Sequence, residues 1–148
     1  MPKWVASHWQ KYVEGCSRVN RQASSTNWRV AKAVFVADDL SKAREYALGP
    51  DSPYVFYYKQ LFTKFSAMGK ISLFKTDANQ PDEDVTFEDV CEKMIIWGTP
   101  EKVRDDLQAF KEEVGEFGTL MYAGMDWADV ELAKRSMILA AEKVAPEL

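Results

Sequence analysis

The residues best placed to do chemistry lie in one turn near the end of the chain. An apolar run, Phe117 to Ala123, stops abruptly at Gly124-Met125-Asp126-Trp127. In a β/α barrel, the residues that follow a strand stand at the carboxyl end of the sheet, where substrates bind. We therefore take Gly124, Met125, Asp126 and Trp127 as candidate substrate-pocket residues. Asp126 could also cap the helix that follows, and a cap and a pocket wall are compatible roles.

A second candidate set is aromatic. Ser52-Pro53 is a good N-cap and first-turn pair, and the helix that it opens carries Tyr54, Tyr57 and Tyr58. These tyrosines are candidate pocket contacts from a helical lid. The alternative is that they belong to an ordinary apolar core.

Other catalytic arrangements find little support. His8 is the only histidine, so Cys–His catalysis would have to use it, and its aromatic helical surroundings favour packing. Cys16 and Cys91 are isolated and form no Cys-x-x-Cys motif, so a zinc site is not expected. The sequence identifies no catalytic residue, no cofactor-binding residue and no metal site.

Two segments read as strands of a parallel sheet. Residues Trp28 to Ala37 are apolar on both faces, as in a strand buried on both sides, and Lys32 is the exception. We expect Lys32 to lie where the neighbouring strand is missing or short. The second strand is Phe117 to Ala123. Ile71 to Phe74 is a possible short extra strand.

Helical patterns occupy most of the remaining chain. The first runs from Lys3 to about Val19, and the last begins between Asp126 and Asp129. The helices expected between these two start after Asp38 or Asp39, at Ser52-Pro53, at Thr86 (ending at Gly98) and at Thr99-Pro100. Two buried-type strands joined by helices should be parallel.

Bulk properties indicate one globular domain over residues 1–148. The chain is 47% hydrophobic and 13% aromatic, which excludes a disordered chain. Its formal charge of −4 gives no reason to expect nucleic acid, and no apolar run is long enough for a membrane span. Two isolated cysteines are typical of a reducing compartment, so we expect a cytoplasmic protein.

Several segments together resemble the bacterial luciferase-like, flavin-dependent monooxygenases, in the branch of long-chain alkane and limonene-type oxygenases. The resemblance spans nearly the whole chain, and its specificity comes from the order and spacing of the motifs. The matching segments are His8-Trp9 with Tyr12 and Gly15, Trp28-Arg29-Val30, Phe35-Val36-Ala37-Asp38, Gly98-Thr99-Pro100-Glu101-Lys102-Val103, Val114-Gly115-Glu116-Phe117-Gly118-Thr119-Leu120, Gly124-Met125-Asp126-Trp127, Ser136-Met137 and Val144-Ala145-Pro146.

The resemblance implies a (β/α)₈ barrel that binds reduced FMN, receives it from a flavin reductase, and oxidises an organic substrate with O₂. Mapped onto that fold, this chain is the C-terminal portion: the last two β/α units with a helical insertion between them. The segments that hold most of the flavin in the family precede this portion. Where the family often has His in the strand-end turn, this chain has Met125.

This mapping predicts a chain that is inactive by itself. Two strands leave two open sheet edges, which favour pairing with another chain. We therefore expect a homodimer or a complex with the remainder of the barrel. The alternative to an enzyme is a non-catalytic, truncated or assembly module that self-associates or pairs with a missing half.

Overall fold

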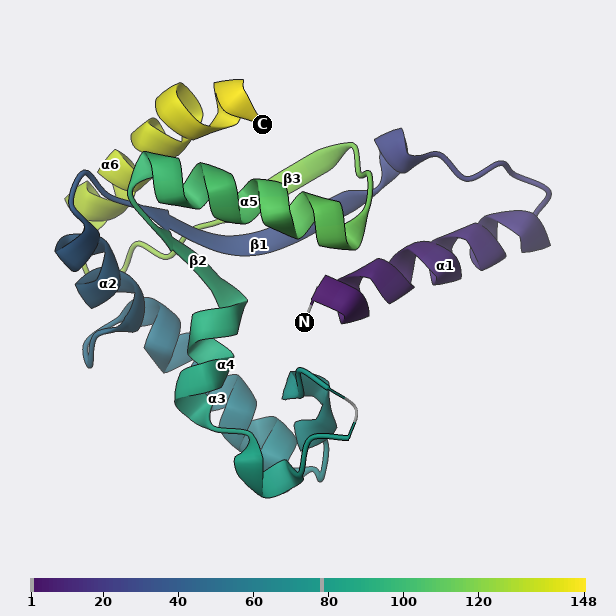
Figure 1. The fold of residues 1–148 in the computed structure, drawn as a ribbon, viewed down its shortest axis with the longest axis horizontal. Helices are drawn as coiled ribbons and strands as arrows, with labels where there is room; N and C mark the ends of the chain where they lie inside the picture. Colours follow the sequence, from purple (N-terminus) through teal and green to yellow (C-terminus); the bar gives the residue numbers. More distant parts are fainter. Residues whose placement is uncertain (1, 78) are drawn as a thin grey trace.

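The computed structural model describes residues 2–77 and 79–148. Its centre is a parallel three-stranded sheet in the order β2-β1-β3 (Figure 1). The strands are β1 (Arg29–Val36), β2 (Ile95–Gly98) and β3 (Thr119–Ala123). The chain is thus an α/β protein, as the sequence predicts.

β1 is the long central strand, and its two neighbours cover different parts of it. β2 pairs with its carboxyl-terminal half, from Ala33↔Ile95 to Val36↔Gly98. β3 pairs with its amino-terminal half, from Arg29↔Thr119 to Ala33↔Ala123. Only Ala33 has a partner on both sides.

Helices supply the rest of the fold, and the expected caps define where they begin. Ser52, Thr86 and Thr99 each accept a backbone N–H of the first turn with the side-chain oxygen. The elements are α1 (Pro2–Arg18), α2 (Leu40–Leu48), α3 (Pro53–Ala67), α4 (Phe87–Met94), α5 (Pro100–Val114), α6 (Val130–Leu139), a π-helical turn (Ala140–Val144) and 3-10 turns at Ser25–Asn27, Ile71–Phe74, Asp82–Asp84 and Ala145–Glu147.

Both faces of β1 are buried in its carboxyl-terminal half, as the composition predicts, whereas Arg29 and Ala31 in its amino-terminal half are exposed. Ala33 and Phe35 pack on one face with the core of α2, α3 and α4. Val34 and Val36 pack on the other face, with the buried side of α5 and the end of α6. Helices therefore cover both faces of the sheet.

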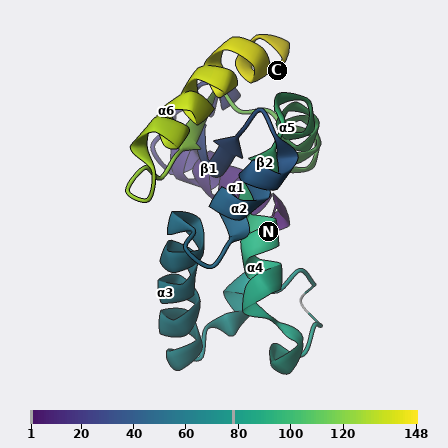
Figure 2. The same ribbon diagram turned by 90° about the vertical axis from the view of Figure 1, so that its left-hand side faces the viewer.

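The helical insertion between β1 and β2 extends away from the sheet. α3 and α4 run side by side in both ribbon views, with the short 3-10 turns at their far end (Figure 2). This part has a small core of its own around Phe74, Val85 and Val90. The helices that the sequence predicts after Ser52 and Thr86 therefore form a lobe beside the sheet.

Two expectations about strands were wrong. Thr86 does cap a helix, but α4 ends at Met94 and the next four residues form β2. Ile95 and Ile96 are β-branched and buried on opposite faces, and a run this short carries no usable periodicity. Ile71–Phe74, a possible strand, is a 3-10 turn that buries Phe74.

The expectation for Lys32 is confirmed. β2 starts opposite Ala33, so Lys32 has no strand partner on that side. Its Nζ instead donates to the backbone oxygen of Lys93, at 2.9 Å, and lies 5.4 Å from the ring centre of Phe110. Burial lowers the pKa of the Lys32 ammonium to about 8.

The strand order differs from that of three consecutive barrel strands. Consecutive strands of a (β/α)₈ barrel follow one another around the sheet, with the helices outside. Here β3 lies on the far side of β1 from β2, and helices cover both faces. β2 and β3 pair with opposite edges of β1, β2 along residues 33–36 and β3 along residues 29–33.

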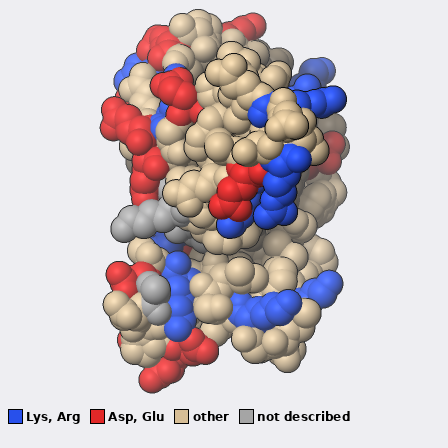
Figure 3. Space-filling view, turned by 90° about the vertical axis from the view of Figure 1, so that its right-hand side faces the viewer, with Lys and Arg blue, Asp and Glu red and all other residues tan. Residues whose placement is uncertain are grey.

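Some apolar surface is left open in the described residues. β3 was expected to be buried on both faces, but it alternates, and Met121 is 53% exposed. α1 lies along α5, with Trp9 packed against Trp28 at 5.4 Å between ring centres. On the face that includes α1, acidic and basic side chains both appear among uncharged ones (Figure 3).

We expect Val34→Asp to unfold the protein. Val34 is 2% exposed, and an unpaired carboxylate there has no polar partner. Circular dichroism and a thermal melt are the measurements. Met121→Asp, on the open face of β3, is the matched control and should melt within a few degrees of the parent. A cooperative, near-parental melt for Val34→Asp would contradict the central position of β1.

Candidate functional site

The topology points to one edge of the sheet. From β1 the chain moves to β2 on one side, and it then passes back over β1 to reach β3 on the other side. In open α/β sheets, ligands bind outside the carboxyl ends of the strands at the point where this direction reverses. That point lies between β1 and β3, where the strand-end turn 124–129 leaves β3.

A tyrosine that the sequence analysis did not select holds this turn. Tyr46, on α2, donates its hydroxyl to the backbone oxygen of Met125 at 2.7 Å. Its ring stacks on Phe35 of β1, with 4.2 Å between ring centres. Burial raises the pKa of the Tyr46 phenol, so it stays a neutral donor. The turn is thereby fastened to the middle of the sheet.

A pair of hydroxyl groups, from Ser136 and Tyr122, connects the middle of α6 to β1 and β3. Ser136 of α6 is fully buried, and its Oγ accepts the backbone N–H of Val36 at 2.7 Å. The Tyr122 hydroxyl lies 2.7 Å from the same Oγ. β3 ends opposite Ala33, so the Ser136 side chain satisfies a β1 donor that β3 does not reach.

Gly124 leaves room for this contact. A Cβ at Gly124 would lie 2.5 Å from Cε1 of Tyr122, and the ring would have to move. The glycine at the end of the strand therefore permits the ring position from which Tyr122 reaches Ser136.

The three predicted tyrosines have different environments. Tyr54 is fully buried and donates to the backbone oxygen of Val34 at 2.8 Å, and burial raises the pKa of its phenol. Tyr58 is buried, also with a raised pKa, while Tyr57 is 43% exposed and packs edge-on against Tyr58. Tyr54 thus belongs to the sheet's core, and only Tyr57 is open to solvent.

The turn residues also separate into two kinds. Met125 is partly buried against the core that contains Phe35. Asp126 is exposed, and Trp127 is 60% exposed. Asp126 does not cap the last helix, because Asp129 accepts the backbone N–H of Leu132 and so occupies the N-cap.

A cavity of about 480 Å³ lies beside the turn, between α2, the turn before α3 and the start of α6. We call it the strand-end cavity. Its lining residues are Lys42, Glu45, Tyr46, Gly49, Pro50, Asp51, Ser52, Pro53, Ala128, Asp129 and Leu132. The predicted site residues flank it but do not line it.

The strand-end cavity does not suit a phosphate group. Lys42 is its one lining cation, against the carboxylates of Glu45, Asp51 and Asp129. The helix N-termini here are also occupied, since Ser52 Oγ accepts from Tyr54 N and Val55 N at the start of α3. An anion would meet like charge and find no free helix end.

A bidentate ion pair joins α6 to the segment that follows β1. Arg135 on α6 donates two hydrogen bonds of 2.9 Å to the Asp38 carboxylate, directly after β1. These bonds from Arg135 lower the pKa of Asp38. Asp39 next to it caps α2, so the two candidate caps have separate roles.

A metal site and a membrane-spanning helix each place requirements on the described residues. Over residues 2–77 and 79–148, no three His, Cys, Asp or Glu side chains come together as ligands for a metal ion. Within the same ranges, no helix combines the length and apolarity needed to cross a bilayer. Burial raises the pKa of the Cys91 thiol to about 12, so this cysteine is not activated as a thiolate.

Tyr46, Tyr122 and Ser136 are not among the site residues predicted from the sequence, although Ser136 stands in the matching segment Ser136-Met137. Tyr46 and Ser136 follow the charged residues Glu45 and Arg135 in their helices, and the adjacent residues do not mark either as a contact of the sheet. Only the fold brings the three hydroxyls to the ends of β1 and β3, and local spacing carries no signal for such long-range contacts.

Similar proteins are monooxygenases. The chain is 30% identical over 142 residues to 4-hydroxyprotoasukamycin monooxygenase of Streptomyces nodosus subsp. asukaensis, an alignment that covers 96% of this chain and 36% of the relative. It is 24% identical over 142 residues to 3,6-diketocamphane 1,6-monooxygenase of Pseudomonas putida, covering 95% and 37%. No family model matches the chain.

Solved structures show the same fold. The oxygenating constituent of Pseudomonas putida 3,6-diketocamphane monooxygenase, a type II Baeyer–Villiger enzyme in complex with FMN, matches with a TM-score of 0.78 and 23% identity over 97% of this chain and 40% of that one. A monooxygenase from Streptomyces bottropensis matches with a TM-score of 0.60 and 19% identity over 98% and 38%. The chain therefore spans well under half the length of the monooxygenases it resembles.

We expect Ser136→Ala to lower the free energy of unfolding by about 1–3 kcal/mol, because it leaves the buried Val36 N–H without an acceptor. Urea unfolding followed by circular dichroism measures the change. Ser66→Ala, at an exposed position of α3, is the matched control and should change stability by less than about 0.5 kcal/mol. Equal, small effects for both variants would show that the Ser136 hydroxyl does not complete the β1 ladder.

Proposed function

We propose that this chain forms the substrate side of a flavin-dependent monooxygenase active site. The alignment of 142 residues with two monooxygenases carries the proposal. The geometry of the site supports it. The turn that Tyr46 holds lies at the point where the strand order reverses, and the strand-end cavity lies beside this turn. The (β/α)₈ barrel and the luciferase-like class remain predictions within this proposal.

The residues present do not fit the phosphate of FMN. The strand-end cavity is lined by three carboxylates and one cation, and the first N–H groups of α3 are already bonded to Ser52. No residue of this chain is therefore assigned to the chemistry of the flavin. If FMN serves the whole enzyme, its phosphate must be bound by groups other than these.

The chain's own contribution is positioning. In cofactor enzymes the protein orients the substrate and excludes water, while the cofactor carries the hard chemistry. Tyr46 fixes the Met125 carbonyl, and Ser136 fixes Val36, so the turn rests on rigid elements. In this proposal Met125, Asp126 and Trp127 are presented from that fixed turn toward the substrate.

A second candidate function is a self-associating assembly module. The open face of β3, with Met121 53% exposed, and the exposed Trp127 favour it. In this alternative, two copies join through β3, and no flavin is bound.

The main test compares FMN with riboflavin, which lacks the phosphate. We expect both to bind the purified chain no more tightly than about 100 μM and within about twofold of each other, because no group here receives the phosphate. Flavin fluorescence quenching is the measurement. A Kd for FMN near 1 μM, which is about 2.7 kcal/mol stronger than 100 μM, would contradict the proposal that this chain does not bind the FMN phosphate. A clear preference for FMN over riboflavin would contradict it as well.

Light scattering after size exclusion tests the alternative. The assembly module requires a stable dimer that forms through β3, whereas weak flavin binding is expected for both candidate functions. Met121→Lys should then give monomers, because it places a charge on the open face of β3. A measured mass of 16.9 kDa for the parent, which is that of a monomer, would contradict both the assembly module and the expected homodimer.

A further inference from the structure

A second cavity lies on the opposite face of the sheet from Tyr46 and the turn. It has a volume of about 360 Å³ and opens between α5, β3 and α6. We call it the apolar cavity. Its lining residues are Val34, Leu107, Leu120, Tyr122, Met137, Ala140, Ala141, Val144, Ala145 and Leu148, none of which has a charged side chain.

The sequence explains why this space is not filled. Ala140, Ala141 and Ala145 contribute only methyl groups where larger side chains would reach the sheet. The helix also changes here from α to π geometry over Ala140–Val144, which widens one turn. Such π segments inside helices are frequent at functional sites.

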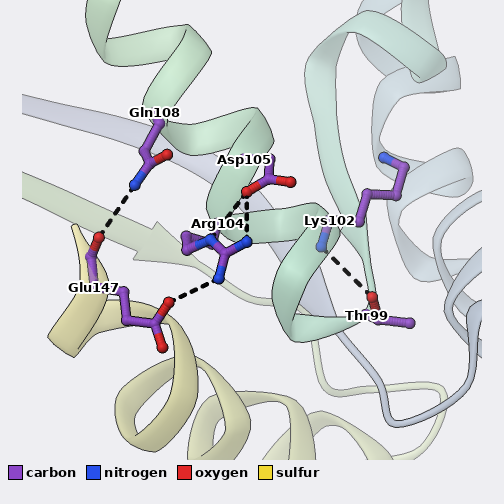
Figure 4. A network of polar contacts seen from close by, with 6 residues as sticks. All are labelled: Thr99, Lys102, Arg104, Asp105, Gln108 and Glu147. Atoms are coloured by element: carbon purple, nitrogen blue, oxygen red, sulfur yellow. Dashed lines mark hydrogen bonds and ion pairs between the residues drawn. The ribbon is translucent and has the colours of Figure 1, made fainter.

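A short strap crosses one side of the apolar cavity, and polar contacts hold it on α5. The strap is the segment 145–148. Glu147 accepts a 2.7 Å bond from Arg104, and its backbone oxygen accepts a 3.2 Å bond from Gln108 (Figure 4). Arg104 also bonds Asp105, so the charges at this rim are paired with one another.

We propose that the apolar cavity binds a neutral, largely apolar small molecule of about the size of a two- or three-ring compound. Its volume lies in the range of about 300–1,000 Å³ that is typical of small-molecule sites. No charged side chain lines its walls to bind a charged ligand, and a helix or strand of a partner would have to displace the strap. The Tyr122 hydroxyl, bonded to Ser136, is the one polar side-chain group of the lining.

Tyr122 also links the two sites. Its ring faces the apolar cavity, while its hydroxyl contacts the serine that holds the end of β1. A ligand against this ring therefore contacts the same framework that positions the strand-end turn. The inference does not depend on the proposed monooxygenase function, because it rests on the cavity alone.

The experiment is a fluorescence titration of the full chain with N-phenyl-1-naphthylamine, a neutral probe that brightens in apolar surroundings. We expect saturable one-to-one binding with a Kd of about 10 μM. Ala141→Trp, at the exposed rim, should fill the opening and weaken binding by at least about tenfold. Met137→Asp, at a second exposed rim position, should also weaken it, since a carboxylate would face the probe.

The matched control is Ala128→Trp, which places the same side chain in the strand-end cavity. It should leave the probe's Kd unchanged within about twofold. The inference is overturned if the parent shows no saturable binding, if Ala128→Trp weakens binding instead of Ala141→Trp, or if neither rim variant has an effect. Melting curves confirm that each variant is folded before its Kd is compared.

Discussion

The structure depends on one constraint on β1. Its apolar side chains must be buried on both faces, and its backbone groups must be hydrogen-bonded along both edges. In its carboxyl-terminal half the faces bury Phe35 on one side and Val36 on the other, so the polar backbone groups of residues 33–36 need partners inside the protein. Neither neighbouring strand is long enough for this. β2 pairs with residues 33–36 along one edge, and β3 pairs with residues 29–33 along the other edge.

Side chains complete the ladder where the strands stop, and the candidate site is built from these same side chains. Ser136 accepts the Val36 N–H, and Tyr54 donates to the Val34 oxygen. Tyr46, stacked on Phe35, extends the framework to the Met125 carbonyl in the turn. Stability and positioning therefore come from one set of contacts, which is why a turn with exposed side chains can still be rigid. A monooxygenase that binds its substrate here would use β1 as the fixed reference for the turn.

The sequence predicted those parts of the fold that local patterns encode. β1 was predictable because apolar residues occupy both of its faces, and the starts of α3, α4 and α5 were predictable from Ser52, Thr86 and Thr99. β2 was missed because four residues after a helix carry no period. Tyr46 and Ser136 were missed because their role lies in contacts 79 and 100 residues away in the chain. The cavity lining depends in the same way on elements that only the fold brings together.

The central claim is that the Val36 N–H is a buried donor satisfied by the Ser136 hydroxyl. Native-state hydrogen exchange followed by NMR measures this amide directly. The account predicts that the Val36 amide exchanges only through global unfolding, with the same protection free energy as the Phe35 and Ala37 amides of the buried strand. Exchange of the Val36 amide at the rate of an exposed loop, while its neighbours stay protected, would contradict the account.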